Sequence, residues 1–248
     1  MCKICIFGGT TEGRSLACTL AGLGAQVCVS VATEYGREEQ PLQPGIQVHT
    51  GRLEAAEMAA LLAGNDLCVD ATHPYSTAAS ANVRQAAQTA AVPYHRLLRR
   101  PSQLPANSVL VPSAAAAAEY LADREGNILL AIGTKELSAF APLERERLYP
   151  RILPAQASLA ACEANRIPHR NIIAMQGPFS QRLNEALLEQ FAIRYLVTKD
   201  GGDVGGFAEK AAASAALGVS LVVIRRPEES GETMEEILRL CEEMMTCR

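Results

Sequence analysis

The sequence predicts an α/β fold made of two Rossmann-like lobes, with mainly parallel sheets and a cleft between them. Apolar runs typical of buried strands alternate with amphipathic or alanine-rich segments along the whole chain. The 248 residues are enough for one large domain or two modest ones, and 48% apolar residues allow a sizeable core. We expect a cofactor-binding lobe over residues 1–100 and a second α/β lobe over residues 101–248.

In the first half of the chain, strands and helices alternate closely. The expected strands are 3–7, 26–31, 46–49, 67–70 and 94–97, and the expected helices are 12–23, 55–62 and 77–90. From residue 99 to residue 112 the pattern loosens into arginine, proline and serine, which is typical of a linker or an edge crossing.

In the second half, strands and helices alternate in the same way, although no sequence repeat is evident between the halves. The expected strands are 127–132, 147–153, 171–175, 194–198 and 220–224, and the expected helices are 113–122, 155–164, 180–189, 207–217 and 232–245. Ligands of such sheets bind beyond the carboxyl ends of the strands, so the loops that follow strands are where functional residues are expected.

The most informative loop follows the first strand. Gly8 and Gly13 match the first and third positions of the dinucleotide fingerprint, while Thr10 stands at the second, where Gly9 is the alternative source of room. Backbone N–H groups at such a turn, together with the positive end of a helix dipole, bind phosphate. The turn predicts a site for a nucleotide or another anion; the alternative is a plain glycine turn in a parallel sheet.

The end of the second strand bears on the choice of cofactor. Folds that bind NAD usually have an acidic residue there, whereas this strand ends in Ser30 and Val31, with Thr33 just beyond. A hydroxyl-rich end followed by Arg37 favours NADP. Glu34 keeps NAD open, because it reaches the ribose if the strand runs longer.

Composition excludes several classes of function. The net charge of −4 argues against nucleic acid as the main partner, and no stretch approaches the roughly 20 apolar residues of a membrane span. A strand that starts at residue 3 leaves no room for a signal peptide, so we expect a cytoplasmic protein. Of the eight cysteines, Cys2 and Cys5 have the spacing of half a metal site but lie on a strand, so we expect reduced thiols and no metal.

Two of the remaining loops combine chemical groups. The loop after residue 70 contains Asp70, His73 and Tyr75, of which the last two could donate a proton or bind a carboxylate, or else simply pack in the turn. The loop after residue 132 contains Gly133, Thr134 and Lys135; at a helix start these residues make a second anion site, and the alternative is ordinary capping.

Two further loops follow strands of the second half. Residues 198–206 contain four glycines with Lys199 and Asp200, which suits a loop that lies flat against a ligand. Residues 175–180 form a sharp turn in which Gln176 could present its amide to the cleft.

Taken in order, these loops resemble the precorrin-6A reductase family of cobalamin biosynthesis. The resemblance is carried by residues 8–13, 31–36, 70–75, 133–137, 175–180, 198–200 and 224–227, and it spans nearly the whole chain. It implies a two-lobed reductase that takes hydride from NADPH or NADH and reduces one double bond of a corrin precursor, either cobalt-bearing or metal-free. The chain departs from the family at residues 201–203, where many relatives have a serine beside the first glycine.

The resemblance, taken with the residues, implies a role for each candidate. Cofactor binding is expected at Gly8, Gly9, Thr10, Thr11, Glu12, Gly13, Ser30, Thr33, Thr134, Lys135, Lys199, Gly201 and Gly202. The carboxylate-fringed macrocycle is expected to meet Arg96, Arg99, Gln176, Asp200 and Arg225. Catalysis needs a proton beside the site of hydride addition, and His73, Tyr75 and Lys199 are the candidate donors.

Other classes of function remain as alternatives. One is a two-lobed tetrapyrrole cyclase or isomerase without nucleotide, and another is a non-enzymatic module that senses a nucleotide. A transferase that uses S-adenosylmethionine is less favoured, because the second strand ends without an acidic residue. Oligomeric state is left open by the sequence.

Overall fold

The computed structural model describes residues 2–99, 102, 104–106, 108–201 and 206–246. The chain forms two compact units, one of Met1–Arg100 with Pro227–Arg248 and the other of Pro101–Arg226. The assignment of residues 227–248 to the second lobe was therefore wrong. The last helix, α9 (Met234–Thr246), buries Ile237 and Cys241 in the core of the first unit. The expected cleft between the lobes stays a prediction.

The first unit is built on a five-stranded parallel sheet with the strand order β3-β2-β1-β4-β5. Its strands are β1 (Lys3–Phe7), β2 (Gln26–Val31), β3 (Ile46–Thr50), β4 (Leu67–Asp70) and β5 (Tyr94–Arg96). Because β2 and β4 lie on opposite sides of β1, the chain reverses its direction of winding between β1 and β4. This switch point is where open α/β sheets bind ligands.

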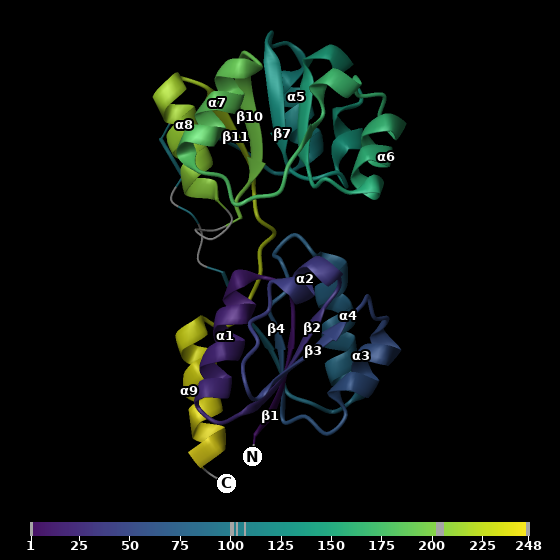
Figure 1. The fold of residues 1–248 in the computed structure, drawn as a ribbon, viewed down its shortest axis with the longest axis vertical. Helices are drawn as coiled ribbons and strands as arrows, with labels where there is room; N and C mark the ends of the chain where they lie inside the picture. Colours follow the sequence, from purple (N-terminus) through teal and green to yellow (C-terminus); the bar gives the residue numbers. More distant parts are fainter. Residues whose placement is uncertain (1, 100–101, 103, 107, 202–205, 247–248) are drawn as a thin grey trace. The chain divides into compact units, whose positions relative to one another are not determined.

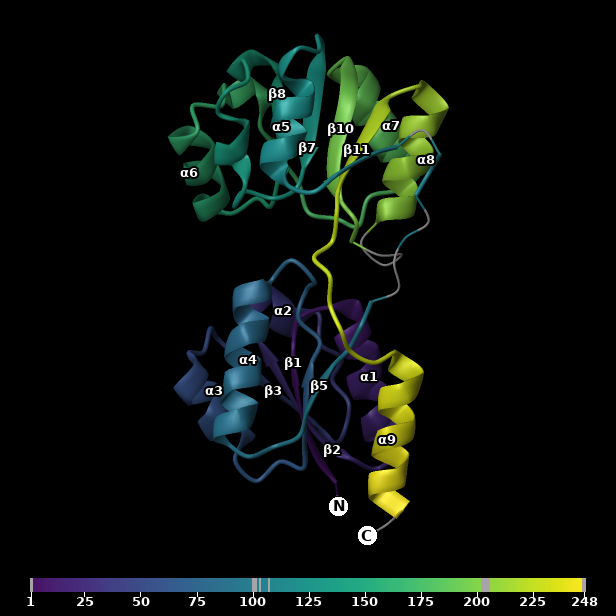
Figure 2. The ribbon, with the colours of Figure 1, turned by 180° about the vertical axis from the view of Figure 1, so that it is seen from behind.

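Helices cover both faces of this sheet (Figures 1 and 2). They are α1 (Thr11–Gly22), α2 (Glu34–Glu38), α3 (Ala55–Leu62), α4 (Thr77–Thr89) and α9. Side chains of β1 alternate between the faces: Ile4 and Ile6 pack with α1 and α9, while Cys5 and Phe7 pack with α3 and α4. The alternation of a fully buried strand thus builds two cores, one on each face.

The second unit has a six-stranded sheet, also parallel, with the order β6-β11-β10-β7-β8-β9. Its strands are β6 (Val109–Val111), β7 (Asn127–Ala131), β8 (Leu148–Ile152), β9 (Ile173–Ala174), β10 (Ile193–Lys199) and β11 (Ser220–Ile224). Read from the far edge, β9-β8-β7-β10-β11 repeats the order of the first sheet, with β6 added. Its switch point lies between β7 and β10.

The helices of the second unit also lie on both faces of the sheet (Figures 1 and 2). They are α5 (Ala114–Ala122), α6 (Gln156–Ala164), α7 (Gln181–Gln190) and α8 (Phe207–Leu217), with short 3-10 turns at Leu137–Phe140, Arg145–Arg147 and His169–Asn171. Leu188 of α7 and Phe207 of α8 pack in one core with Leu129 and Leu196 of the sheet.

The predicted α/β class with parallel sheets is confirmed. The sequence missed β6, which lies inside the expected linker, and α2, whose five residues are too few to show helical periodicity. No helix in the described part of the chain is long and apolar enough to cross a bilayer. None of the seven cysteines that the structure describes forms a disulfide, and no described group of three or more His, Cys, Asp or Glu side chains is placed to hold a metal.

Candidate functional site

The glycine turn after β1 lies against the loop after β4. Gly8 has a φ of +153°, and a Cβ added there would lie 2.4 Å from the carbonyl oxygen of Ala71. A Cβ on Gly13 would lie 3.0 Å from the Ala71 Cβ, so this glycine brings α1 close to β4. Gly9 is exposed and has no atom within 4 Å of an added Cβ. Gly8 is thus required by the fold, while Gly9 leaves open space above the turn.

Thr10 fixes the start of α1 at this switch point. Its hydroxyl accepts a hydrogen bond from the N–H of Gly13 at 3.1 Å and donates one to the Ala71 carbonyl at 2.9 Å. Thr10 therefore caps the helix and joins the two loops, which are roles of the turn itself. The exposed Thr11 opens the helix, where the first N–H groups have no acceptor within the helix.

Glu12, in the first turn of α1, forms a bidentate ion pair with Arg99. The two oxygens of Glu12 lie 2.6 Å from Nε and Nη2 of Arg99, and both side chains are largely buried. A small hollow between them is also lined by Thr10, Thr72 and Pro74. The structure thus brings together a residue expected at the cofactor and one expected at the substrate.

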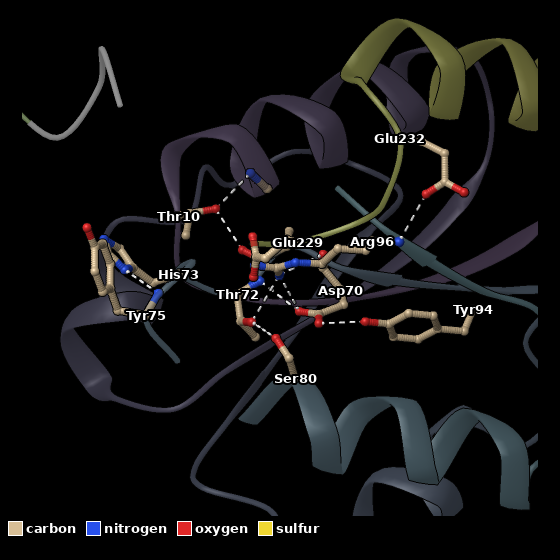
Figure 3. Close-up of polar contacts among 12 residues, drawn as sticks. Thr10, Asp70, Thr72, His73, Tyr75, Ser80, Tyr94, Arg96, Glu229 and Glu232 are labelled. Carbon is tan, nitrogen blue, oxygen red and sulfur yellow. Dashed lines mark hydrogen bonds and ion pairs between the residues drawn. The ribbon is translucent and has the colours of Figure 1, made fainter. Parts of the chain in front are cut away.

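Asp70, at the end of β4, anchors the second loop of the switch point (Figure 3). Its fully buried carboxylate accepts hydrogen bonds from the Tyr94 hydroxyl at 2.9 Å, the Thr72 N–H at 3.0 Å and Arg96 Nη1 at 2.8 Å. Burial, followed by the charge of Asp70, raises the pKa of Tyr94 to about 12. Thr72 also shares a 2.9 Å hydrogen bond with Ser80 of α4, which fixes the loop against that helix.

Arg96, at the end of β5, is held by carboxylates of the chain itself. Only 4% of its side chain is exposed, and its guanidinium binds Asp70 and, at 2.9 Å, Glu229. Glu229 belongs to the segment that returns from the second unit, and this segment continues beside β5, where Glu232 bonds the backbone of Arg96 and Leu98. Two carboxylates of the chain thus neutralise Arg96, and its expected contact with the substrate stays a prediction.

His73 and Tyr75 lie together in the middle of the same loop (Figure 3). Their ring centroids are 5.6 Å apart, and the N–H of Tyr75 donates to Nδ1 of His73 at 3.4 Å. Both residues are partly exposed. The imidazole therefore has its Nδ1 turned toward the loop backbone, as the packing alternative predicted, and this leaves the proposed proton donor role untested.

Ser30 and Thr33 serve the fold at the end of β2. Ser30 is 6% exposed, and its carbonyl accepts the Gly8 N–H at 2.9 Å. Its expected contact with the cofactor stays a prediction. Thr33 is exposed, and its hydroxyl accepts from the N–H of Gly36 at 3.0 Å as the N-cap of α2.

The second switch point is spanned by a charge pair. Lys199, which ends β10, lies with its Nζ 2.5 Å from Oε2 of Glu136 in the loop after β7. Gly133 has a φ of +76°, while Thr134 is half-buried and Lys135 exposed. The chain continues in a four-residue 3-10 turn and not in an α-helix. The expected helix start is therefore wrong, because the aligned N–H groups of an α-helix are missing, while binding of the cofactor by Thr134 and Lys135 stays a prediction.

Asp200 is also used by the chain itself. It is 8% exposed, and its Oδ1 accepts from the Ser102 N–H at 3.3 Å and lies 3.3 Å from Nη2 of Arg226. Its expected role in substrate binding stays a prediction. Arg225, by contrast, is exposed, as is Gln176. Gly201 is buried, and Gly202 lies outside the described residues.

Sequence reasoning located the loops but missed the ion pairs within them. Glu12 and Arg99, Arg96 and Glu229, and Asp200 and Arg226 are far apart in the chain. The sequence nevertheless contained a signal for such ion pairs. Parallel strands end at one edge of a sheet, so oppositely charged residues that follow neighbouring strands lie close enough to pair. Glu136, next to Lys135, and Arg226, next to Arg225, are the partners that this rule would have found.

The comparisons with known proteins agree over nearly the full chain. A family model described as precorrin-6x reductase CbiJ/CobK matches residues 3–242. A cobalt-precorrin-6A reductase from Priestia megaterium is 34% identical over 95% of this chain and 96% of its own length. A precorrin-6A reductase from Rhodococcus erythropolis is 33% identical over 96% of this chain and 95% of its own. The solved structure of the CobK precorrin-6A reductase superimposes with a TM-score of 0.78 at 25% identity, covering 98% of this chain and 97% of that one.

Proposed function

This chain belongs to the precorrin-6x reductase family CbiJ/CobK, and from that membership we propose how its residues divide the work of the reaction. The protein is an oxidoreductase of cobalamin biosynthesis that reduces precorrin-6A, with or without cobalt. A reduced nicotinamide cofactor, when bound, supplies the hydride. The nucleotide-free cyclase and the sensing module are not favoured, because the relatives are named as reductases.

The first unit is the proposed cofactor site, and the closeness of Gly8 to Ala71 is the observation that carries this proposal. The turn suits a dinucleotide because Gly9 is open above it and α1 presents its N-terminus. Gly8, Gly13 and Thr10 shape the turn, so the backbone at Gly9, Thr11 and Glu12 is left to face the pyrophosphate. In this proposal the ion pair of Glu12 with Arg99, whose charges balance, fixes the first turn of α1 beside the pyrophosphate.

NADPH is the proposed cofactor. The end of β2 offers no acidic side chain at Ser30 or Val31, and Arg37 is exposed just beyond, beside Glu34 at 3.8 Å. A ribose 2′-phosphate suits an arginine, whereas the ribose hydroxyls of NADH suit a carboxylate. An Arg37→Gln variant is therefore expected to lose affinity for NADPH and to keep its affinity for NADH, which fluorescence titration measures.

The proton donor is proposed among the three residues that the sequence suggests. His73 and Tyr75 lie on the loop that closes over the glycine turn, and Lys199 lies at the second switch point with Glu136. Loss of the donor is expected to lower kcat by about 100-fold, whereas loss of a residue that only positions the substrate raises KM. His73→Gln, Tyr75→Phe and Lys199→Met, compared at saturating cofactor, separate these outcomes.

Exposed cations of the second unit are the proposed partners of the macrocycle carboxylates. Lys135 and Arg225 lie in loops that follow parallel strands, and Gln176 adds an amide after β9. Each charge-assisted contact contributes about 1.5–3 kcal/mol when it is well formed.

The reductase activity is tested with purified protein, metal-free and cobalt-bearing precorrin-6A, and NADPH or NADH in the four combinations. Oxidation of the cofactor that matches a spectral change of the macrocycle identifies both the preferred cofactor and the preferred substrate. If a well-folded protein oxidises no cofactor in any combination, the proposed function is wrong.

A further inference from the structure

Three cysteines form a row across neighbouring strands of the first sheet. Cys5 on β1 is in register with Cys28 on β2 and with Cys68 on β4. Residues that pair in register on parallel strands point to the same face of the sheet. The three side chains accordingly pack in one core, on the face that α3 and α4 cover. The first sheet thus holds three neighbouring thiols that the reductase reaction does not use.

The spacing of Cys5 and Cys28 suits a disulfide. Neighbouring strands of a sheet lie about 4.7–4.9 Å apart, and disulfides join Cα atoms that lie about 4.4–6.8 Å apart. In the structure neither cysteine forms a disulfide, and the S–H of Cys5 donates a hydrogen bond to the sulfur of Cys28. The sheet therefore holds the two sulfur atoms turned toward each other, with the strands already in register.

The two thiols of this pair differ in exposure and in acidity. Cys5 is fully buried, whereas Cys28 is partly exposed. Gln47, the register partner of Cys28 on the edge strand β3, is exposed, so solvent reaches the sheet edge beside Cys28. The hydrogen bond from Cys5 lowers the pKa of Cys28 against the effect of burial, while the same hydrogen bond, followed by burial, raises the pKa of Cys5. Cys28 is therefore the thiol that ionises first and that a solute meets first.

Cys68, the other register partner of Cys5, is less suited to react. It is fully buried, and burial, followed by the charge of Asp70, raises its pKa to about 12. A thiol attacks an oxidant as its thiolate, so a buried thiol with a raised pKa is inert. The row thus contains two register pairs, of which only the pair of Cys5 with Cys28 includes an accessible thiol.

We propose that Cys28 and Cys5 form a redox-active pair that a hydroperoxide converts to a disulfide between β1 and β2. With hydrogen peroxide, the Cys28 thiolate attacks one oxygen, the O–O bond breaks, and Cys28 becomes a sulfenic acid. The hydroxide that leaves takes up the proton that Cys28 released. The sulfur of Cys5 then attacks the Cys28 sulfur, the S–O bond breaks, and the hydroxyl group leaves as water with the proton of Cys5. Two thiols and one peroxide thus give one disulfide and two waters.

The product suits its surroundings. The neighbouring core side chains, among them Phe7, Val83 and Ala86, are apolar. A disulfide carries no charge, so it is buried there at less cost than a lasting thiolate. Both cysteines belong to the first unit and neither has a role in the proposed reaction, so the pair goes beyond the proposed function and does not depend on it.

The test treats the reduced full-length chain with hydrogen peroxide, blocks the remaining thiols with N-ethylmaleimide and analyses a tryptic digest by mass spectrometry. Trypsin cleaves after Lys3, Arg14 and Arg37, so a bond between Cys5 and Cys28 joins the peptides 4–14 and 15–37. Because Cys18 lies in the second peptide, a Cys18→Ser chain is treated in parallel. We expect the cross-linked peptides in both chains, with the loss of two hydrogens, and we expect dithiothreitol to separate them.

Two variants and one chemical control test the assignment of the pair. Cys28→Ser is expected to abolish the cross-link, and Cys68→Ala is expected to leave it unchanged. A brief treatment of the native chain with N-ethylmaleimide before the peroxide is expected to modify Cys28 ahead of Cys5 and to prevent the cross-link. This last control needs no substitution, so it holds even where a core variant fails to fold.

Other results overturn the proposal. A bond from Cys5 to Cys68, or a cross-link that is lost in Cys18→Ser, assigns the reaction to a different thiol. Oxidation of Cys28 that stops at the sulfenic or sulfinic acid shows that Cys5 does not reach it. A Cys28 that stays reduced while the same peroxide oxidises free glutathione shows that the thiol is inaccessible. A cross-link that forms only in urea belongs to the unfolded chain.

Discussion

The two units share the order of five strands, but the two loops at the switch point contact each other in different ways in each unit. In the first unit, the loops after β1 and β4 meet backbone to backbone at Gly8 and Ala71, and an α-helix begins at once. In the second unit, the loops after β7 and β10 meet through the side chains of Glu136 and Lys199, and a 3-10 turn follows. The shared strand order therefore determines where each switch point lies. The loops at the switch point determine which chemical groups are available there. Backbone N–H groups suit a pyrophosphate, and side-chain charges suit carboxylates.

Among the variants that test this difference between the two units, a substitution at Gly8 is expected to have the largest effect. Gly8→Ala places a Cβ 2.4 Å from the Ala71 carbonyl oxygen at a φ that disfavours side chains, so the loops must move apart. We expect the free energy of unfolding to fall by about 3 kcal/mol and binding of NADPH to be lost. Gly9→Ala is the matched control, because nothing lies within 4 Å of its added Cβ, and denaturant unfolding should show native stability. Equal stability of the two variants would contradict the close contact.

The next largest effect is expected at Arg96, which ties the 70–76 loop to the returning segment. Arg96→Met leaves the fully buried Asp70 without its cation and should lower the free energy of unfolding by about 3 kcal/mol. Because the guanidinium is buried against two carboxylates of the chain, KM for the macrocycle should stay within about twofold in the folded fraction. A large rise of KM at native stability would restore the original expectation that Arg96 binds substrate.

The corresponding change in the second unit is expected to cost less. Arg226→Met removes a partner of Asp200, but this pair is longer, at 3.3 Å, and its side chains retain 12–14% exposure. Because this ion pair is longer and more exposed to solvent, we expect the free energy of unfolding to fall by only about 1 kcal/mol, which urea unfolding measures. If Arg226→Met destabilises the protein as much as Arg96→Met, the two anchors do not differ as described.

The smallest expected effect concerns the hydrogen bond between Tyr94 and Asp70 in the first unit, and it is seen at high pH. The pKa of Tyr94 is raised from 10.0 to about 12, so the unfolded chain ionises this phenol before the native protein does. The stabilising contribution is present below pH 10 and is lost as the pH rises toward 12. Tyr94→Phe should cost about 1 kcal/mol at neutral pH, through the lost hydrogen bond to Asp70, and should show a shallower decline above pH 10. Parallel declines in both proteins would assign the loss to other groups.

The sequence was sufficient for most strands and most helices, since apolar runs and their spacing determine those locally. It was insufficient for α9, because nothing local tells whether Ile237 and Cys241 pack on the nearest sheet or on one that the chain left far earlier. The same lack of local information limits how much of the candidate site can be predicted from the sequence. Glycine turns and loops are local patterns, whereas the pairing of Arg99 with Glu12, or the burial of Arg96, depends on contacts between distant segments.

The return of α9 to the first unit also sets an order of assembly on the ribosome. The second unit is one continuous stretch, Pro101–Arg226, and all of its strands have been synthesised before α9 exists. The N-terminal sheet, although made first, keeps the apolar face of Ile4, Val29 and Leu67 partly uncovered until Ile237 and Cys241 arrive. The unit whose sheet is synthesised earlier is thus completed later, because α9 supplies its last buried side chains.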